Sequence, residues 1–453
     1  MNRRKRMVLI ALSLSILLII AACGGAGNNE PNNAAAGADA AKDQAASNTS
    51  GNQAQANPEP EKKKPVTLDY VWFTDGVEGE VMKGIIQDYQ NENAHVTINL
   101  IEVAYKDLDT KLKTMIAGGK PPALSRLTNP GAYVNQALDL SPYVGDVQAF
   151  MGQFVESVRP YYYIDNKIVA IPMDVTANGL IYNKTLFDKA GVAVPQSGDD
   201  VWTWDEYAAA LQQVKDKGGA KHGMVWDYTP HRWSTMLYQF GGSIFNEDIT
   251  AATINNENGI RAVEYFVKLH KDGLMPESVW LGGENPNNLF RTGTVGAHFS
   301  GNWMISNYKD IDNFEWGITY APKELQRSSV PGGKYVTAFQ GSGVEDETVA
   351  FMQYMSSKEV NAKYTSHSLF ISPRIDNAKL DYEFGSEMFA IFADELNNTP
   401  ASAARDWSQQ EILPKVQNEI RDGIVEVLTG TKTAQQAMDA VAEKINAAIQ
   451  DQK

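Results

Sequence analysis

Near the start of the main body of the chain, the spacing of apolar residues changes between two periods. Apolar and polar side chains alternate over 66–72 and 96–100, which predicts two strands. Behind each strand, apolar residues recur every three or four positions, over 81–89 and 108–116, which predicts two helices. This strand–helix order predicts a mainly parallel sheet covered by helices, with the loops at the carboxyl ends of the strands open to a ligand.

The same alternation continues towards the C-terminus. A strand is predicted over 179–182 and a helix over 184–190, which Gly191 ends. Two capping boxes, Thr203 with Glu206 and Thr433 with Gln436, open further helices that carry apolar stripes. The body is therefore predicted to be α/β throughout, without an internal repeat.

The first residues carry an export signal. A basic cluster precedes an apolar run, and the run ends in Ala21-Ala22 just before Cys23, the single cysteine of the chain. Small residues before a cysteine resemble the signal of bacterial lipoproteins, in which the cysteine receives acyl chains such as palmitate. A transmembrane helix is the alternative, but it needs about 20 apolar residues, more than this run has. The sequence predicts a signal peptide over 1–22 and a lipid anchor at Cys23.

Residues 23–64 are predicted to form a disordered linker. They are mostly Gly, Asn, Ala, Gln, Ser, Pro and Lys, without large apolar side chains that would offset the entropy of ordering. The linker is either a tether that lets the body move near a membrane partner or a simple spacer.

Charge and composition exclude several classes of function. The formal net charge is −15, which argues against nucleic acid, because its binding needs a basic surface. The six histidines are scattered without metal-site spacing. Tyr161 to Tyr163 resemble tyrosinate ligands of iron, but an alternating strand there would turn at least one ring into the core. No metal or cofactor is predicted.

Four stretches, taken in order, carry a family resemblance. Residues 165–184, 202–206, 290–303 and 370–374 resemble the motifs of family 1 extracellular solute-binding proteins, the maltose-binding-protein-like components of ABC importers. Two departures stand out: His298 replaces the usual methionine, and Ala123 replaces the usual aspartate after a proline.

The resemblance implies a periplasmic-binding-protein-like fold of two α/β lobes around a ligand cleft. It places residues 65–173 plus 336–357 in one lobe and residues 174–335 plus 358–453 in the other. Crossover segments form the hinge, and ligand-driven closure is read by the membrane permease. A monomer is the family expectation.

Candidate ligand-binding residues follow from sugar chemistry. Sugars pack C–H faces on aromatic rings and need hydrogen-bond partners for their hydroxyl groups. Residues of both kinds occur at strand ends, in the first crossover, in a late turn and at the opening of the C-terminal helices: Trp72, Asp75, Asp174, Thr176, Trp226, Asp227, Trp233, Trp303, Arg374 and Trp407. The resemblance places a ligand-stacking ring at Trp303.

Each candidate also has a structural interpretation. A tryptophan that follows a strand is more often part of the core, and Asp75 has the position of a helix cap. Asp174 and Thr176 suit a hinge as well as a ligand contact. Arg374 suits a buried ion pair.

The sequence predicts a lipid-anchored binding protein that delivers a sugar, specifically an oligosaccharide, to an ABC permease. A non-sugar solute is the first alternative. A surface-anchored glycosidase is the second, with Asp75 and Asp174 as its two carboxylates. No nucleophile elbow, phosphate loop or metalloprotease motif is present, so catalysis is not predicted.

Overall fold

The strands and helices predicted at the start of the body are present in the computed structural model, which describes residues 63–74 and 76–452. β1 (Val66–Trp72), α1 (Glu78–Glu92), β2 (Val96–Glu102) and α2 (Leu108–Ala117) follow one another. The predicted signal peptide, Cys23, Asp75 and nearly all of the predicted linker lie outside the described residues.

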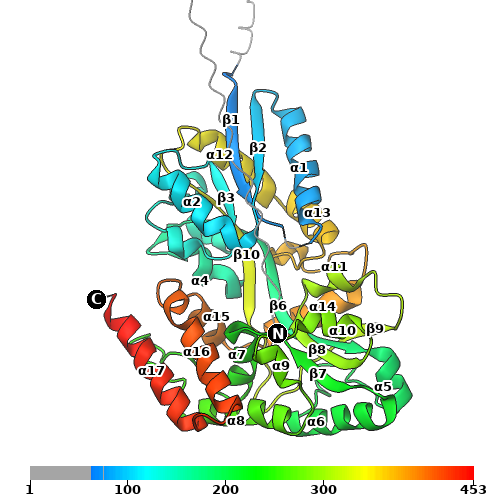
Figure 1. Ribbon diagram of the computed structural model, residues 1–453. Helices are drawn as coiled ribbons and strands as arrows, with labels where there is room; N and C mark the ends of the chain where they lie inside the picture. Colours follow the sequence, from blue (N-terminus) through cyan, green and yellow to red (C-terminus); the bar gives the residue numbers. More distant parts are fainter. Residues whose placement is uncertain (1–62, 75, 453) are drawn as a thin grey trace, which may run out of the picture. The chain divides into compact units, whose positions relative to one another are not determined.

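Two long strands connect the halves of one continuous sheet. β6 (Ile171–Asn183) and β10 (Pro331–Ala338) lie at its centre, in the order β2-β1-β3-β10-β6-β8-β7. The outer strands are β3 (Leu124–Leu127), β7 (His222–Trp226) and β8 (Val295–Gly301), and β9 (Trp316–Thr319) also pairs with β6. Figure 1 shows β10 and β6 passing between the two halves of the body.

The sheet is mixed rather than mainly parallel. β1 pairs in parallel with β2 and β3, and β7 pairs in parallel with β8. β10 is antiparallel to β3 and β6, and β6 is antiparallel to β8 and β9. The antiparallel pairs arise because the chain crosses the molecule once along β6 and returns along β10.

We call β1 to β3 and the helices on them the first lobe, and β7 to β9 and the helices on them the second lobe. In the first lobe, α13 (Lys358–Ser368) packs against α1, beside α12 (Glu345–Ser356). Lys363 of α13 pairs with Asp88 of α1 at 2.6 Å. The predicted boundary assigns 358–453 to the second lobe, whereas α13 lies beside α1 (Figure 1). The lobe boundaries as a whole stay a prediction.

Both predicted capping boxes are present, with Thr203 and Thr433 as the N-caps. The second lobe contains α5 (Lys184–Ala190), α6 (Trp204–Gln213), α7 (Pro230–Gln239), α8 (Glu257–Lys271), α9 (Glu277–Trp280), α10 (Pro286–Arg291), α11 (Met304–Tyr308), α14 (Ser386–Asn397), α15 (Ala401–Trp407), α16 (Leu413–Leu428) and α17 (Ala434–Gln450). Gly191 ends α5 with φ 69°, a left-handed conformation that suits glycine.

The tyrosine run does not form the expected strand. Tyr161 and Tyr162 belong to the short helix α4 (Arg159–Tyr162), in which Pro160 occupies the first turn. Only Tyr163 enters a strand, β4 (Tyr163–Ile164), which pairs with β5 (Lys167–Ile168). Tyr161 and Tyr162 are both buried, so they pack in the core.

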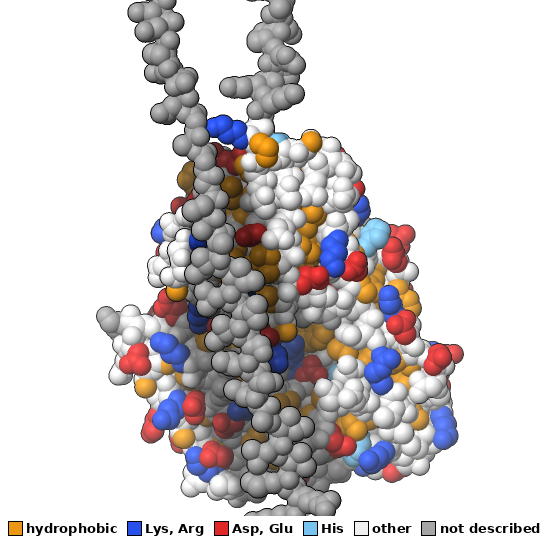
Figure 2. Space-filling model, turned by 45° about the horizontal axis from the view of Figure 1, so that its top comes forward, with side chains coloured by type: hydrophobic (Ala, Val, Ile, Leu, Met, Phe, Trp, Pro, Cys, Tyr) orange, Lys and Arg blue, Asp and Glu red, His pale blue; other side chains and the backbone are white. Residues whose placement is uncertain are grey.

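The surface carries mixed charge. On the face that Figure 2 shows, acidic and basic side chains are interspersed, and no continuous basic patch is visible there.

Within residues 63–74 and 76–452, no helix combines the length and apolar character that crossing a membrane requires.

Candidate ligand-binding site

The carboxyl ends of β7 and β8 bring two predicted site residues together. The two strands are parallel neighbours, with Trp226 opposite Phe299. Asp227 follows β7 directly, and Trp303 lies two residues beyond the end of β8. Because parallel strands end at the same edge of a sheet, both side chains lie at one edge of the second lobe.

Asp227 is held by two residues of β8 on the same face of the strand. Nε2 of His298 is hydrogen-bonded to Oδ1 at 2.7 Å, and the Ser300 hydroxyl donates to Oδ2 at 2.6 Å. Burial alone would raise the pKa of Asp227, but His298, Arg232 and Ser300 stabilise the carboxylate, so the pKa lies below its ordinary value. Asp227 is therefore ionised, and Nδ1 of His298 is hydrogen-bonded to the Tyr308 hydroxyl at 2.7 Å. We call Asp227, His298, Ser300 and Tyr308 the Asp227 bracket.

Arg232 connects the Asp227 bracket to Trp303. Its Nε lies 3.7 Å from Oδ2 of Asp227, and its guanidinium carbon lies 4.4 Å from the centroid of the Trp303 ring. The N-cap of α7, Thr229, accepts a hydrogen bond from the Arg232 backbone N–H. The arginine side chain therefore starts from a fixed helix turn and lies over the indole.

Asn302 fixes the chain just before Trp303. Its backbone N–H donates to the carbonyl of Ala177 at 3.1 Å, and its Oδ1 accepts from the Ala177 N–H at 2.9 Å. Asn302 is fully buried, whereas Trp303 is half-buried. The Trp303 ring thus lies beside the crossover strand β6, with part of its surface accessible.

A buried ionic cluster lies at the corresponding edge of the first lobe. Arg126 of β3 contacts Glu78 at 3.1 Å and Asp174 of β6 at 3.8 Å, and all three side chains are fully buried. Its guanidinium also donates to the carbonyl of Phe73 at 2.6 Å, and it lies 4.7 Å from the Trp72 ring centroid. The cluster joins the end of β1, β3 and the crossover strand.

The two crossover strands approach each other closely where Asp174 and Thr176 lie. Gly332 pairs with Thr176, and Gly333 pairs with Val175 in the adjoining position. A Cβ at Gly332 would lie 2.7 Å from Oγ1 of Thr176, so a side chain would not fit there without a shift. Both glycines belong to β10.

Three of the predicted tryptophans are enclosed. Trp226 is 1 % exposed and stacks on Phe299 with a centroid distance of 4.0 Å. Trp72 and Trp233 are fully buried. These rings pack in the core of the described structure, in agreement with the structural interpretation, and their ligand contacts stay a prediction.

Trp407 and Arg374 have internal partners. Nε1 of Trp407 donates to the Ser234 hydroxyl at 2.8 Å, and its ring meets that of His231 edge-on at 4.6 Å. Burial and the neighbouring Arg232 lower the pKa of His231 to about 3, so the imidazole is neutral. Arg374 is nearly buried and donates two hydrogen bonds to Asp376.

A cavity of about 600 Å³ lies on the other face of β6. It is lined by Val155 and Pro160 before and within α4, by Val175 and Ile371 at the crossover, and by Leu396 at the end of α14. Because strand side chains alternate, Val175 points away from the side of Asp174 and Thr176. The cavity therefore lies apart from the Trp303 edge.

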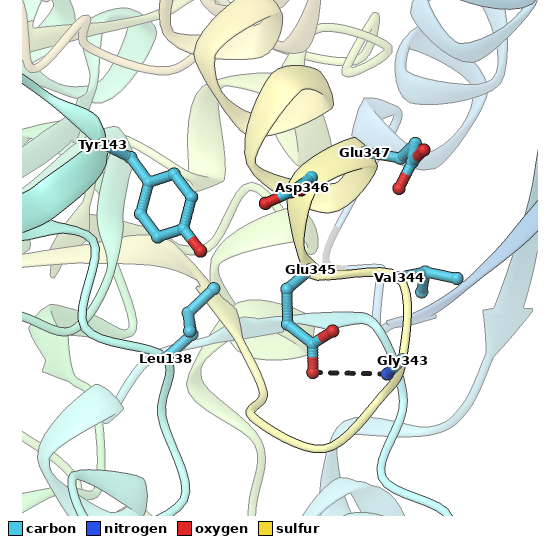
Figure 3. Close-up of a pocket in the computed structure, with 7 residues that line it drawn as sticks. All are labelled: Leu138, Tyr143, Gly343, Val344, Glu345, Asp346 and Glu347. Atoms are coloured by element: carbon cyan, nitrogen blue, oxygen red, sulfur yellow. Dashed lines mark hydrogen bonds between the residues drawn. The ribbon is translucent and has the colours of Figure 1, made fainter. Parts of the chain in front are cut away.

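A second hollow, of about 410 Å³, lies at the start of α12. Glu345 accepts hydrogen bonds there from the N–H groups of Gly341 and Gly343, and Figure 3 shows the latter contact beside Asp346 and Glu347. Burial would raise the pKa of Glu345, but the backbone N–H groups lower it, and the net shift is downward. Glu345 caps its own loop, so this hollow has a structural explanation.

Within the described part of the chain, no three His, Cys, Asp or Glu residues gather as a metal site would require.

Comparison with known proteins agrees with this architecture. The family model of the bacterial extracellular solute-binding proteins matches residues 84–388, more than half of the chain. The chain belongs to this family. It is therefore a solute-binding protein, and the members of this family are not enzymes.

Curated relatives are similar over most of their length. A putative binding protein of Brucella abortus is 26 % identical over 326 residues, covering 69 % of this chain and 77 % of the relative. The multiple sugar-binding protein of Streptococcus mutans is 27 % identical over 334 residues, covering 69 % and 76 %.

Solved structures confirm the fold of this solute-binding protein. A Listeria monocytogenes substrate-binding protein, solved with cycloalternan, has 23 % identity and a TM-score of 0.73, covering 85 % of this chain and 99 % of that one. The cyclic α-maltosyl-1,6-maltose-binding protein of Arthrobacter globiformis has 22 % identity and a TM-score of 0.71, covering 85 % and 100 %. The predicted α/β, periplasmic-binding-protein-like fold is thus confirmed.

The sequence did not point to Arg126, Glu78 or Ser300 as parts of the site edges. One signal was available for Arg126, because it is the one charged residue in the stretch 121–130. A charge in a buried strand needs a partner.

Proposed function

We propose that this solute-binding protein is the lipid-anchored component of an ABC importer and that it binds a sugar, specifically an oligosaccharide, between its two lobes. The observation that carries the proposal is the half-buried Trp303 ring beside Arg232 and the ionised Asp227. An aromatic face next to charged hydrogen-bonding groups suits a ligand with C–H faces and hydroxyl rims.

The relatives support a carbohydrate ligand. Besides the streptococcal multiple sugar-binding protein, a lactose-binding protein of Rhizobium radiobacter is 22 % identical over 293 residues. Structural neighbours were solved with oligosaccharides such as maltotetraose and mannotriose. A sugar is the ligand class that these relatives share.

A phosphorylated polyol is the second candidate. The sn-glycerol-3-phosphate-binding protein of Escherichia coli is 23 % identical over 406 residues, covering 83 % of this chain and 91 % of the relative. The site edges favour a neutral ligand, because Arg126 faces Glu78 and Asp174, and Arg232 faces Asp227. A phosphate would have to compete with these carboxylates.

Lobe contacts support a ligand-linked closure. A Cβ at Gly76 in the first lobe would lie 3.0 Å from Oγ of Ser306 in α11 of the second lobe. The lobes thus approach each other closely near Trp303. A ligand that contacts both lobes favours their approach, and the permease then distinguishes loaded from empty protein.

The localisation part of the proposal rests on the sequence. The lipoprotein-like signal ends at Cys23, and the following polar segment suits a linker between an anchor and the body. We propose an extracytoplasmic protein, held on the membrane by acyl chains, that acts as a monomer. Labelling with palmitate in the native host, with Cys23→Ala as the control, tests the anchor.

Calorimetric titration tests the ligand class. The mature chain, with Cys23→Ser to prevent acylation, is titrated with mono- and oligosaccharides and with glycerol-3-phosphate. Saturable binding of a sugar, with a smaller radius of gyration in scattering, is expected. If only glycerol-3-phosphate binds, the ligand is a phosphorylated polyol rather than a sugar. Hydrolysis of a sugar would contradict the proposal.

A further inference from the structure

One face of the Trp303 ring is covered by a cation. The guanidinium carbon of Arg232 lies 4.4 Å from the ring centroid, within the range of a cation–π contact. We propose that Arg232 is the positioning residue of the Trp303 platform, and that it thereby helps to decide which sugars stack there. This inference rests on the proposed function.

The Asp227 bracket holds the Arg232 side chain in position. Arg232 and Asp227 are 26 % and 19 % exposed, and an ion pair this accessible gains little from Coulomb attraction alone. Asp227 itself cannot move easily, because His298 holds one carboxylate oxygen and Ser300 the other. The Arg232 side chain therefore has few conformations, because it starts from a fixed helix turn and ends beside a fixed carboxylate.

The second contact of the ring limits the platform further. A Cβ built on Gly301 would overlap Cζ3 and Cη2 of Trp303, so this edge of the ring lies against the strand. Arg232 covers one face of the ring and Gly301 lies against one edge, so a sugar contacts only the remaining surface of the indole. The ring is thereby oriented before the ligand arrives, which reduces the entropy lost on binding.

Arg232 acts on the ligand through the ring. Its guanidinium presents planar N–H donors and no acceptor, and it lies over the indole beside the Asp227 carboxylate. The ligand class that fits is therefore a neutral sugar that stacks a C–H face on the uncovered surface of the indole.

A double-mutant cycle tests whether Arg232 acts through the ring. Arg232→Ala, Trp303→Ala and the double variant are titrated with the tightest-binding sugar. If the proposal holds, Arg232→Ala raises the Kd by about 5- to 30-fold, and it adds less than about threefold in the Trp303→Ala background. Losses that multiply would show independent action and would overturn the proposal.

Conservative variants separate positioning from folding. Arg232→Lys keeps the charge but lacks the planar fork, and it is expected to lose affinity like Arg232→Ala. Trp303→Phe keeps an aromatic face should Trp303→Ala unfold. Arg261→Ala is the matched control: Arg261 lies 5.6 Å from the Phe240 centroid and pairs with Glu324 at 2.9 Å. Its loss should leave the Kd unchanged, and an equal loss of affinity would contradict the proposal.

Fluorescence distinguishes failure of this inference from failure of the proposed function. Without sugar, Arg232→Ala should alter tryptophan emission in the parent protein but not in the Trp303→Phe background. An equal change in both backgrounds, or none in either, overturns the positioning role. If the parent binds no sugar yet shows this dependence on Trp303, the sugar function fails while the Arg232–Trp303 relationship stands.

Discussion

The backbone of Gly301 lies against the Cζ3–Cη2 edge of the Trp303 ring, which follows it two positions later in the chain. A Cβ on Gly301 would overlap two ring carbons of Trp303, and it would lie 2.6 Å from the Ala177 carbonyl oxygen on β6. Neither obstacle is a flexible chain end, because one is an indole ring and the other is backbone. Glycine is thus required for Trp303 to lie where it does.

Gly301→Ala should therefore displace the Trp303 ring and weaken sugar binding by about 1 to 3 kcal/mol, the range of aromatic stacking losses. Calorimetry measures the Kd, and a changed tryptophan emission reports the ring. Gly84→Ala is the control, because nothing lies within 4 Å of a Cβ at that position of α1. It should bind sugar normally and gain about 0.5 to 1 kcal/mol of stability. Unchanged affinity in Gly301→Ala would show that the ring is not a platform.

Gly131 and Gln410 form another contact between the lobes. Gly131 lies in the turn after β3, and Gln410 follows α15 in the second lobe. A Cβ at Gly131 would lie 2.8 Å from Cβ of Gln410 and 2.9 Å from its Cγ. Gly131→Ala should hold the lobes apart and raise the Kd about tenfold, with a larger radius of gyration in the presence of sugar.

A second substitution tests this explanation. Adding Gln410→Gly removes the two nearest atoms that a Cβ at Gly131 would meet and leaves only Cδ1 of Ile164, at 3.3 Å, so the double variant should regain most of the affinity. Failure of this rescue would indicate that Gly131→Ala acts through the turn itself rather than through the lobe contact.

Arg126 is predicted to be a main determinant of stability. Arg126→Met removes the guanidinium that pairs with the buried carboxylates of Glu78 and Asp174, which should lower the free energy of unfolding by about 3 to 5 kcal/mol. Urea unfolding measures the loss. Lys113→Met is the control, because its pair with Asp109 is largely exposed, at 69 % and 59 %, and should cost less than about 1 kcal/mol. Similar losses in both variants would contradict the importance of burial.

The sequence predicted much of the local structure in both lobes because the signals for it are local. The periods over 66–72 and 81–89 and the capping box at Thr203 depend on neighbours within one element, and all three features are present. The place of α13 was not predictable in this way. Its contact with α1 depends on pairs such as Lys363 with Asp88, which lie 275 residues apart.

The candidate site was harder to predict for a similar reason. Trp226 ends β7 and Trp303 follows β8, and the sequence alone does not distinguish the two rings. Their difference arises from tertiary packing, since Phe299 of β8 stacks on Trp226, whereas Arg232 and Gly301 leave part of Trp303 accessible.

Glu395 should make stability depend on pH between its ordinary pKa of 4.5 and its shifted value. Burial raises the pKa of Glu395 to about 7, although Arg327, 3.3 Å away, and the Ala321 N–H oppose the shift. The folded state therefore binds this proton more tightly than the unfolded state. The contribution of this proton to stability, up to about 3 kcal/mol, is fully present below pH 4.5 and is lost as the pH rises through about 7.

Glu395→Gln keeps an acceptor for the Ala321 N–H but cannot titrate. The unfolding free energy of the variant relative to that of the parent should therefore increase from pH 5 to pH 7.5. Urea unfolding at both values measures this, and a difference that is constant with pH would contradict the raised pKa.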